Sequence, residues 1–297
     1  MAMHDLPSWV DPWCRASLGA EPAEILFIAG YLSEVLGFRL ADGREVVVKR
    51  RADESGRTRT CLAGQRLLAE EGFPCPMPLT DVTFQSGFAV HAERLIRGGE
   101  VETEDTPAAA KRSAALLADL IGRLTAFELD PPVPNPEWLR WETLPDQQAA
   151  AEAPTWIEDT SRRVRTKLSE CRLPSILGHA DWEAQNIRWL HSEPLVVHDW
   201  DSLAWLPEAV LAGAAASVFA SHDTPTLAPV ESSAAFLDAY QRARGERFSS
   251  GEEEIAWAAT ILVALNNVRD ELMFDHPRLS YERLKAQRGE RLARASA

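Results

Sequence analysis

The sequence predicts an α+β fold with a small β-rich lobe at the N-terminus and a larger helical lobe at the C-terminus. Up to about residue 97, short runs rich in β-branched and aromatic residues are broken by turn signals, which is typical of β-sheets. Beyond that point apolar residues recur mostly at helical spacing. The stretch IRGGE at 96–100 has the composition of a hinge, so we expect domains at 1–97 and 98–297.

The first domain is expected to have the order β-β-β-α-β. Asp42-Gly43 is a hairpin signal between the second and third strands. Leucines at roughly helical spacing predict a helix over 60–72, with Gly72 just past its end and three prolines after it. The strand-like stretches are 24–40, which holds two strands, 45–50 and 87–95.

The second domain is expected to be mostly helical. It opens with a long amphipathic helix over 106–130, whose Thr106-Pro107 pair is an N-terminal helix signature. The exception is 176–201, where short apolar runs surround charged residues and predict small strands joined by loops. There is no internal repeat and no low-complexity linker.

The stretch 176–201 has several polar side chains among apolar ones. Carboxylates flanked by Ile, Leu and Val carry a desolvation cost of several kcal/mol unless a partner or a metal compensates. A compensating metal would make the stretch a functional site. The residues concerned are His179, Asp181, Asn186, His198, Asp199 and Asp201.

Composition restricts the class of partner and the compartment. The net charge of −14 argues against nucleic-acid binding, which needs a basic surface, and is compatible with a cationic ligand. Four cysteines lie far apart without disulfide or zinc spacing, which fits a reducing cytoplasm. No targeting or membrane-spanning segment is predicted, so we expect a cytoplasmic protein, monomer or homodimer, with no membrane partner.

Several motifs occur together in an order that resembles the aminoglycoside phosphotransferase and choline kinase-like family, which has a bilobal protein-kinase-like fold. GHADWEAQN at 178–186 is similar to its catalytic loop, and VVHDWD at 196–201 to its metal-binding segment. GYLSEVLGFRL at 30–40 and EVVVKR at 45–50 look like its nucleotide-binding loop and lysine strand. FPCPMPL and ERLIRGGE extend the resemblance over nearly the whole chain.

The resemblance implies a small-molecule kinase that uses ATP or GTP with Mg²⁺. Phosphoryl transfer needs an aligned acceptor oxygen and neutralised phosphate charge rather than covalent help from the protein. Asp181 would orient the acceptor hydroxyl, while Asn186 and Asp199 offer the hard oxygen ligands that Mg²⁺ prefers. The implied nucleotide-binding residues are Lys49, Gly30, Ser33, Glu93 and Leu95.

The acceptor is expected to be small and cationic, such as an aminoglycoside or another amino sugar. Carboxylates on the catalytic loop and the C-terminal helices would bind its amines, and the candidates are Glu183, Asp201, Asp270 and Glu271. Each residue also has a structural interpretation. Asp181 has the residue type of a helix N-cap, and Lys49 that of a strand-end lysine. Asp270 and Glu271 would then mark a solvated helix end.

The sequence departs from the family pattern at three points. Ala180 stands where the catalytic loop usually has glycine, which would disfavour a positive φ. The helix after Lys49 has no glutamate to pair with it, and we expect Gln65 or Glu54 to take that place. The loop at 30–35 has fewer glycines than in protein kinases.

Three other interpretations remain open. The missing helix glutamate is compatible with a nucleotide-binding pseudokinase that serves as a scaffold. A metabolic choline- or sugar-type kinase would share every motif quoted above. A protein kinase is disfavoured, because HDWD is not Asp-Phe-Gly and no Ala-Pro-Glu-type segment follows it.

Overall fold

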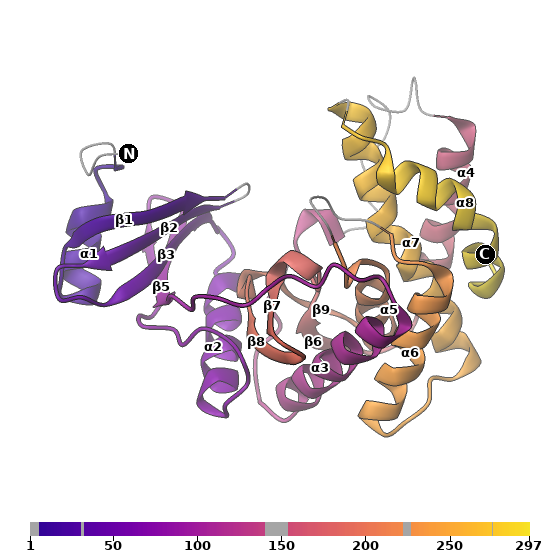
Figure 1. Cartoon of the computed structure of the whole chain (residues 1–297), viewed down its shortest axis with the longest axis horizontal. Coiled ribbons are helices and arrows are strands. Elements are labelled where there is room, and N and C mark those ends of the chain that lie inside the picture. The colour runs from indigo at the N-terminus through magenta and orange to yellow at the C-terminus, as the bar shows by residue number, and fades with distance from the viewer. Residues whose placement is uncertain (1–5, 31–32, 140–153, 222–226, 275) are drawn as a thin grey trace. The chain divides into compact units, whose positions relative to one another are not determined.

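A computed structural model of the chain describes residues 6–30, 33–139, 154–221, 227–274 and 276–297 (Figure 1). The chain forms two compact units, one of residues 1–98 with 129–134 and the other of 99–128 with 135–297. The first unit is built on a β-sheet and the second mostly on helices, which confirms the predicted α+β class. Residues 129–134, which the sequence analysis assigned to the C-terminal lobe, belong to the first unit.

The first unit contains a five-stranded antiparallel sheet in the order β1-β2-β3-β5-β4. The predicted β-β-β-α-β series is present, with an additional helix before it and an additional short strand before β5. The elements are α1 (Val10–Leu18), β1 (Pro22–Ala29), β2 (Glu34–Leu40), β3 (Glu45–Ala52), α2 (Arg57–Glu70), β4 (Thr83–Gln85) and β5 (Phe88–Arg94).

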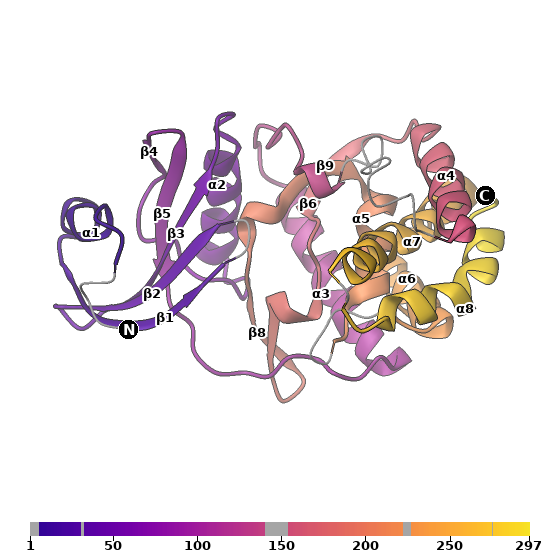
Figure 2. The same ribbon diagram turned by 90° about the horizontal axis from the view of Figure 1, so that it is seen from above.

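The two faces of this sheet have different roles because side chains alternate along each strand. One face forms a core with α1, in which Phe38, Val46, Val48 and Val90 are buried beside Trp13. The residues that alternate with these along the strands therefore point to the opposite face of the sheet. Figure 2 shows α1 and α2 on opposite sides of the sheet.

Helix α2 is tied to the end of β3 by one buried carboxylate. Asp53 Oδ2 accepts a hydrogen bond from the backbone N–H of Thr58 at 2.8 Å, and Oδ1 accepts from the N–H groups of Ser55 and Gly56. Gly56, with φ 79°, is the N-cap and contributes no side-chain bond of its own. Asp53 therefore satisfies donors that the first turn of a helix leaves unpaired.

The second unit consists of helices around two small antiparallel strand pairs, β6 with β9 and β7 with β8. The predicted helix at 106–130 is α3 (Pro107–Thr125), and Thr106 caps it as the Thr-Pro signature indicated. The other elements are η2 (Glu137–Leu139), α4 (Thr155–Ser169), β6 (Ser175–His179), η4 (Ala184–Asn186), β7 (Ile187–Leu190), β8 (Glu193–Val197), η5 (Trp200–Ser202), β9 (Leu203–Pro207), α5 (Glu208–Val218), α6 (Val230–Arg244), α7 (Ser250–Met273) and α8 (Leu279–Arg294).

Helix α5 is the centre of this unit. All its residues after Glu208 are buried, and Gly213 approaches α7 so closely that a Cβ there would lie 2.1 Å from the carbonyl oxygen of Ala256. Because α5 follows β9 directly, this packing fixes the position of the β6–β9 pair, which flanks the charged stretch that the sequence singles out. Within the described residues, no helix is both long and apolar enough to cross a membrane.

Candidate active site

The catalytic-loop candidate begins where β6 ends, at His179. Its Nε2–H donates to the carbonyl oxygen of His198 at 2.9 Å, and its ring makes edge contacts with Trp182 and Trp200. His179 is fully buried, and the backbone N–H of Ala180 bonds the carbonyl oxygen of Ser202. His179 therefore holds together the two charged segments of the sequence, 178–186 and 196–201.

Asp181 and Asn186 are joined directly. The Asn186 side-chain nitrogen lies 2.9 Å from Asp181 Oδ2 and 2.9 Å from the Asp181 carbonyl oxygen, so it donates to both. The turn of η4 brings the two residues together, with the Asn186 N–H bonded to the Glu183 carbonyl oxygen. The amide nitrogen is thereby assigned to Asp181, which leaves the amide oxygen as the group suited to a cation.

Asp199 is presented by an unusual backbone. Its φ of 62° and ψ of 50° are left-handed, a conformation in which Asp is among the tolerated residues. The Ser202 hydroxyl donates to Asp199 Oδ2 at 2.8 Å, and the preceding N–H, of His198, bonds the Asn186 carbonyl oxygen at 2.7 Å. These bonds link the two predicted metal ligands through the β7–β8 pair.

The residues present fit a divalent cation whose remaining ligands would be phosphate oxygens and water. Asn186 and Asp199 supply hard oxygen donors, and Mg²⁺ at nucleotide sites is commonly held by only one or two protein ligands. No group of three or more His, Cys, Asp or Glu side chains with metal-binding geometry occurs in the described part of the chain. The donor set thus fits a nucleotide-bound metal better than an all-protein metal site.

The electrostatics of this loop favour the approach of a cation. Burial raises the pKa of Asp181, and the nearby charge of Asp201 raises it further against hydrogen bonds from Asn186. Burial and the charge of Asp181 raise the pKa of Glu183 to about 8. A positive ion or amine at the loop would relieve this repulsion and lower both values.

In the first unit, Lys49 pairs with a strand residue. Its Nζ lies 3.0 Å from Glu93 Oε1, and both side chains are buried. Gln65 donates to Glu93 at 2.8 Å and its own oxygen has no hydrogen-bond partner, so the expectation that Gln65 accepts from Lys49 is wrong. No sequence pattern predicts this pair, because it depends on the pairing of β3 with β5.

The loop between β1 and β2 requires glycine at position 30. Gly30 has φ 131°, and a Cβ there would lie 1.8 Å from the carbonyl oxygen of Ser33. Tyr31 and Leu32 lie outside the described residues. Leu95 follows β5 half-buried, with its N–H bonded to the Glu45 carbonyl oxygen. The contacts of Gly30, Ser33, Glu93 and Leu95 with a nucleotide stay predictions.

One departure from the family pattern, Ala180, has a simple structural outcome. Ala180 is absent from the residues with positive φ in the described chain, so its backbone does not require glycine. Its side chain lies in a small apolar cavity shared with Leu206, Leu262 and Asn266. Helix α7 therefore passes beside the catalytic loop at Leu262 and Asn266.

The four acceptor-binding candidates fall into two pairs. Glu183 lies on the catalytic-loop candidate and Asp201 on η5, both close enough for their charges to interact with that of Asp181. Asp270 is exposed one helical turn beyond Asn266, and burial raises its pKa despite an opposing effect of His276. The structure thus places Asp270 on the stretch of α7 that leads away from the catalytic loop.

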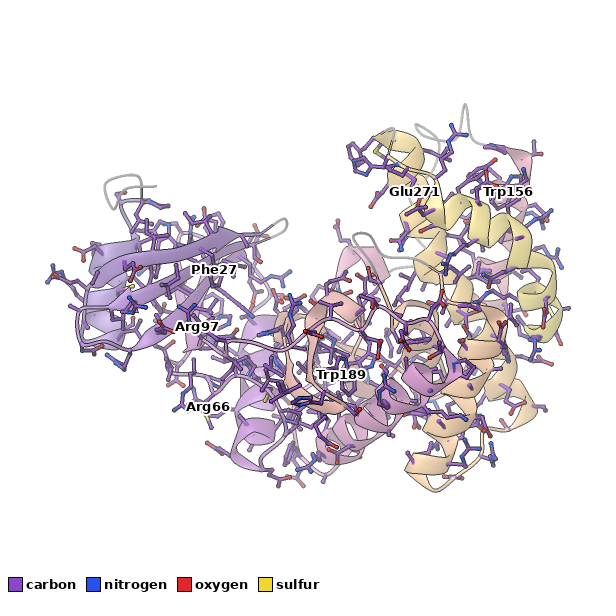
Figure 3. The ribbon with its side chains drawn as sticks, viewed as in Figure 1. Phe27, Arg66, Arg97, Trp156, Trp189 and Glu271 are labelled. Atoms are coloured by element: carbon purple, nitrogen blue, oxygen red, sulfur yellow. The ribbon has the colours of Figure 1, made fainter. Side chains whose placement is uncertain are left out.

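Glu271 has a structural role. Its Oε1 accepts from the N–H of Ser280 at 2.6 Å and its Oε2 from the N–H of Tyr281 at 2.9 Å, so the side chain caps α8 from the end of α7 (Figure 3). The residue is 9% exposed. The alternative of a solvated helix end is wrong for Glu271, and neither carboxylate oxygen lacks a partner.

Comparison with known proteins gives structural matches alone. No protein-family model matches the sequence, and neither does any curated protein. The structure is similar to amicoumacin kinase in complex with AMP-PNP, Ca²⁺ and Ami, with a TM-score of 0.65 and 14% identity over 86% of this chain and 82% of that one. An aminoglycoside phosphotransferase from Alicyclobacillus acidocaldarius matches with a TM-score of 0.56 and 12% identity over 95% and 94% of the two chains.

Spectinomycin phosphotransferase, in complex with ADP and spectinomycin, matches with a TM-score of 0.57 and 12% identity. That match covers 97% of this chain and 93% of the other. High coverage on both sides means that the likeness includes both units. The chain therefore has the protein-kinase-like fold of the aminoglycoside phosphotransferases.

Proposed function

We propose that this protein is a kinase that transfers the γ-phosphate of ATP or GTP to a hydroxyl group of a small cationic acceptor, such as an aminoglycoside or another amino sugar. The observation that carries the proposal is the arrangement of Asp181, Asn186 and Asp199 on one hydrogen-bonded loop system. The similar structures include amicoumacin kinase and spectinomycin phosphotransferase, which supports the same reaction class.

Asp181 acts on the acceptor in this proposal. Its carboxylate accepts a hydrogen bond from the acceptor hydroxyl, orients the oxygen toward the γ-phosphorus, and takes the proton as the new P–O bond forms and the bond to the leaving diphosphate breaks. Asn186 keeps the carboxylate in place through its amide nitrogen. Precise orientation matters more than basicity here, because the acceptor is deprotonated late in a loose transition state.

Asn186 and Asp199 are the residues that would hold Mg²⁺. The ion, when bound, neutralises charge on the β- and γ-phosphate oxygens. Asp199 contributes the anionic oxygen, oriented by the Ser202 hydroxyl, and Asn186 the neutral one. In the first unit, Lys49 is proposed to bind phosphate, with backbone N–H groups at Gly30 and Ser33 as further donors.

A cationic acceptor is supported by the excess of acidic side chains at the catalytic loop. Burial and the charge of Asp201 raise the pKa of Asp181, burial and the charge of Asp181 raise the pKa of Glu183, and an acceptor amine would offset this cost of ionisation. Asp270 is a further candidate for an amine. With an aminoglycoside as the acceptor, the proposed role is antibiotic resistance, and the four free cysteines support a cytoplasmic location.

The pseudokinase alternative loses its main motivation. It rested on the absence of an acid from the helix after Lys49, but Glu93 provides a buried carboxylate for that lysine. A metabolic choline- or sugar-type kinase remains the second candidate, since the same three residues would serve it.

The proposal is tested by measuring ADP release from ATP and GDP release from GTP, each with Mg²⁺, against a panel of acceptors. The panel should contain aminoglycosides, simple amino sugars, choline and neutral sugar alcohols. Acceptor-dependent ADP release, together with a mass increase of one phosphate on an amine-bearing acceptor, is the expected result. Nucleotide binding without turnover of any acceptor would favour the scaffold.

A further inference from the structure

The carboxylate that pairs with Lys49 comes from the sheet itself. Lys49 on β3 is directly opposite His91 on β5, and Glu93 lies two residues further along β5, on the same face. The Lys49 Nζ to Glu93 Oε1 distance is 3.0 Å, with exposed fractions of 8% and 1% for the two residues. Because β3 and β5 are hydrogen-bonded neighbours, the folded sheet alone brings these two charges together.

Helix α2 contributes an amide to this pair. Gln65, which is fully buried, donates from Nε2 to Glu93 Oε2 at 2.8 Å and to the Pro76 carbonyl oxygen at 2.8 Å. Both hydrogens of its amide are therefore used, which fixes the group in one orientation. The second carboxylate oxygen of Glu93 is held in place by that amide while the first faces Lys49.

The surroundings keep Glu93 ionised despite its burial. Desolvation would raise its pKa, but the charges of Lys49 and His91 and the hydrogen bond from Gln65 outweigh it and hold the pKa below its usual value. An ionised carboxylate in this place restrains a flexible lysine side chain through a charge-assisted hydrogen bond. Removal of the charge would leave a buried lysine without that restraint.

We propose that Glu93 is the positioning residue for Lys49 and that it replaces the glutamate missing from α2, with Gln65 as its support. The inference rests on the proposed function, in which Lys49 binds nucleotide phosphate, and it assigns Glu93 no contact with the nucleotide. It also has a consequence for regulation. Since the pair is formed within one sheet, a movement of α2 does not by itself separate Lys49 from its carboxylate.

The test uses the full chain and titration calorimetry with Mg·ATP and with adenosine. Glu93→Gln should weaken Mg·ATP binding at least about tenfold, the value of one charge-assisted hydrogen bond, and leave adenosine binding unchanged. Glu93→Asp, which keeps the charge on a shorter side chain, should weaken Mg·ATP binding less than Glu93→Gln does. Glu45→Gln is the matched control. It alters a carboxylate of β3 that pairs with Arg97 at the surface, and it should leave Mg·ATP affinity unchanged.

The outcomes separate this inference from the proposed function. Unchanged Mg·ATP affinity in Glu93→Gln, in a protein that loses affinity on Lys49→Ala, would overturn the inference alone. An equal loss of adenosine binding would assign the effect to damage of the buried cluster and would also overturn it. Absence of Mg·ATP binding by the unmodified chain would contradict the proposed function and this inference with it.

Discussion

The side-chain amide of Asn186 donates to both the carbonyl oxygen and the carboxylate of Asp181, at 2.9 Å in each case. One residue thus orients the proposed catalytic carboxylate, and its own amide oxygen is the proposed metal ligand. The two functions are coupled, so a change at Asn186 should affect both the binding of metal-nucleotide and the chemical step. The Asp199 carboxylate, in turn, is supported by the Ser202 hydroxyl.

The first prediction concerns the proposed metal ligands. Asp199→Ala should abolish the Mg²⁺-dependence of nucleotide affinity, because it removes the anionic ligand. Asn186→Ala should weaken that dependence less and lower kcat as well. Calorimetric titration of ATP at several Mg²⁺ concentrations measures the first effect, and Gln185→Ala, an exposed neighbour, serves as control. An undiminished Mg²⁺-dependence in Asp199→Ala would remove that residue from the metal site.

The second prediction concerns pH. Burial and the charge of Asp181 raise the Glu183 pKa from 4.5 to about 8, so the folded protein binds a proton that the unfolded chain releases in that interval. Stability should therefore fall as pH rises from about 4.5 to 8. Glu183→Gln should flatten this dependence and unfold at a higher temperature than the unmodified chain near pH 8. Thermal unfolding scans of both proteins at pH 5 and pH 8 measure this dependence. An equal change in unfolding temperature between the two pH values in both proteins would disagree with the prediction.

The third prediction separates Glu271 from its neighbour Asp270. Glu271→Ala should destabilise the protein by about 1–3 kcal/mol, because two N–H groups at the start of α8 lose their acceptor. Asp270→Asn should leave stability unchanged and raise KM for a cationic acceptor at low salt. Urea denaturation and acceptor kinetics measure the two effects. A KM effect confined to Glu271→Ala, without loss of stability, would contradict the structural role of Glu271.

The fourth prediction concerns the attachment of α2. Hydrogen bonds from Thr58, Ser55 and Gly56 outweigh desolvation and lower the pKa of Asp53, so its contribution to stability is present above the unfolded pKa and is lost as pH falls. Asp53→Ala should cost about 1–2 kcal/mol at pH 7. The difference from the unmodified chain should shrink below about pH 4. Asp81→Asn, at an exposed carboxylate, is the control in the same denaturation series.

Local signals in the sequence predicted the elements that carry strong patterns. The helix expected at 60–72 is α2 at Arg57–Glu70, and Gly72 has the positive φ of 78° expected just past its end. Helix α1 was not predicted, because it is only nine residues long and contains Pro12. Its apolar residues become informative only when they pack on the sheet, as Trp13 and Cys14 do.

The parts of the candidate site that could be predicted are those whose residues lie close together in the sequence. Asp181 and Asn186 are five residues apart, so one turn of chain brings them together. The Lys49–Glu93 pair depends on the register of β3 against β5, and the Glu271 cap depends on the angle between α7 and α8. No spacing rule within one segment encodes such contacts, and only the folded structure reveals them.

The central claim is that Asp181 orients and deprotonates an acceptor hydroxyl for transfer of the γ-phosphate. The most direct measurement is the rate of phosphate transfer from Mg·ATP to the best acceptor of the panel by the unmodified chain and by Asp181→Asn, with Mg·ATP affinity measured in parallel. We expect Asp181→Asn to lower kcat by about 10²–10⁴ with little change in nucleotide affinity. Near-normal turnover by Asp181→Asn would contradict it.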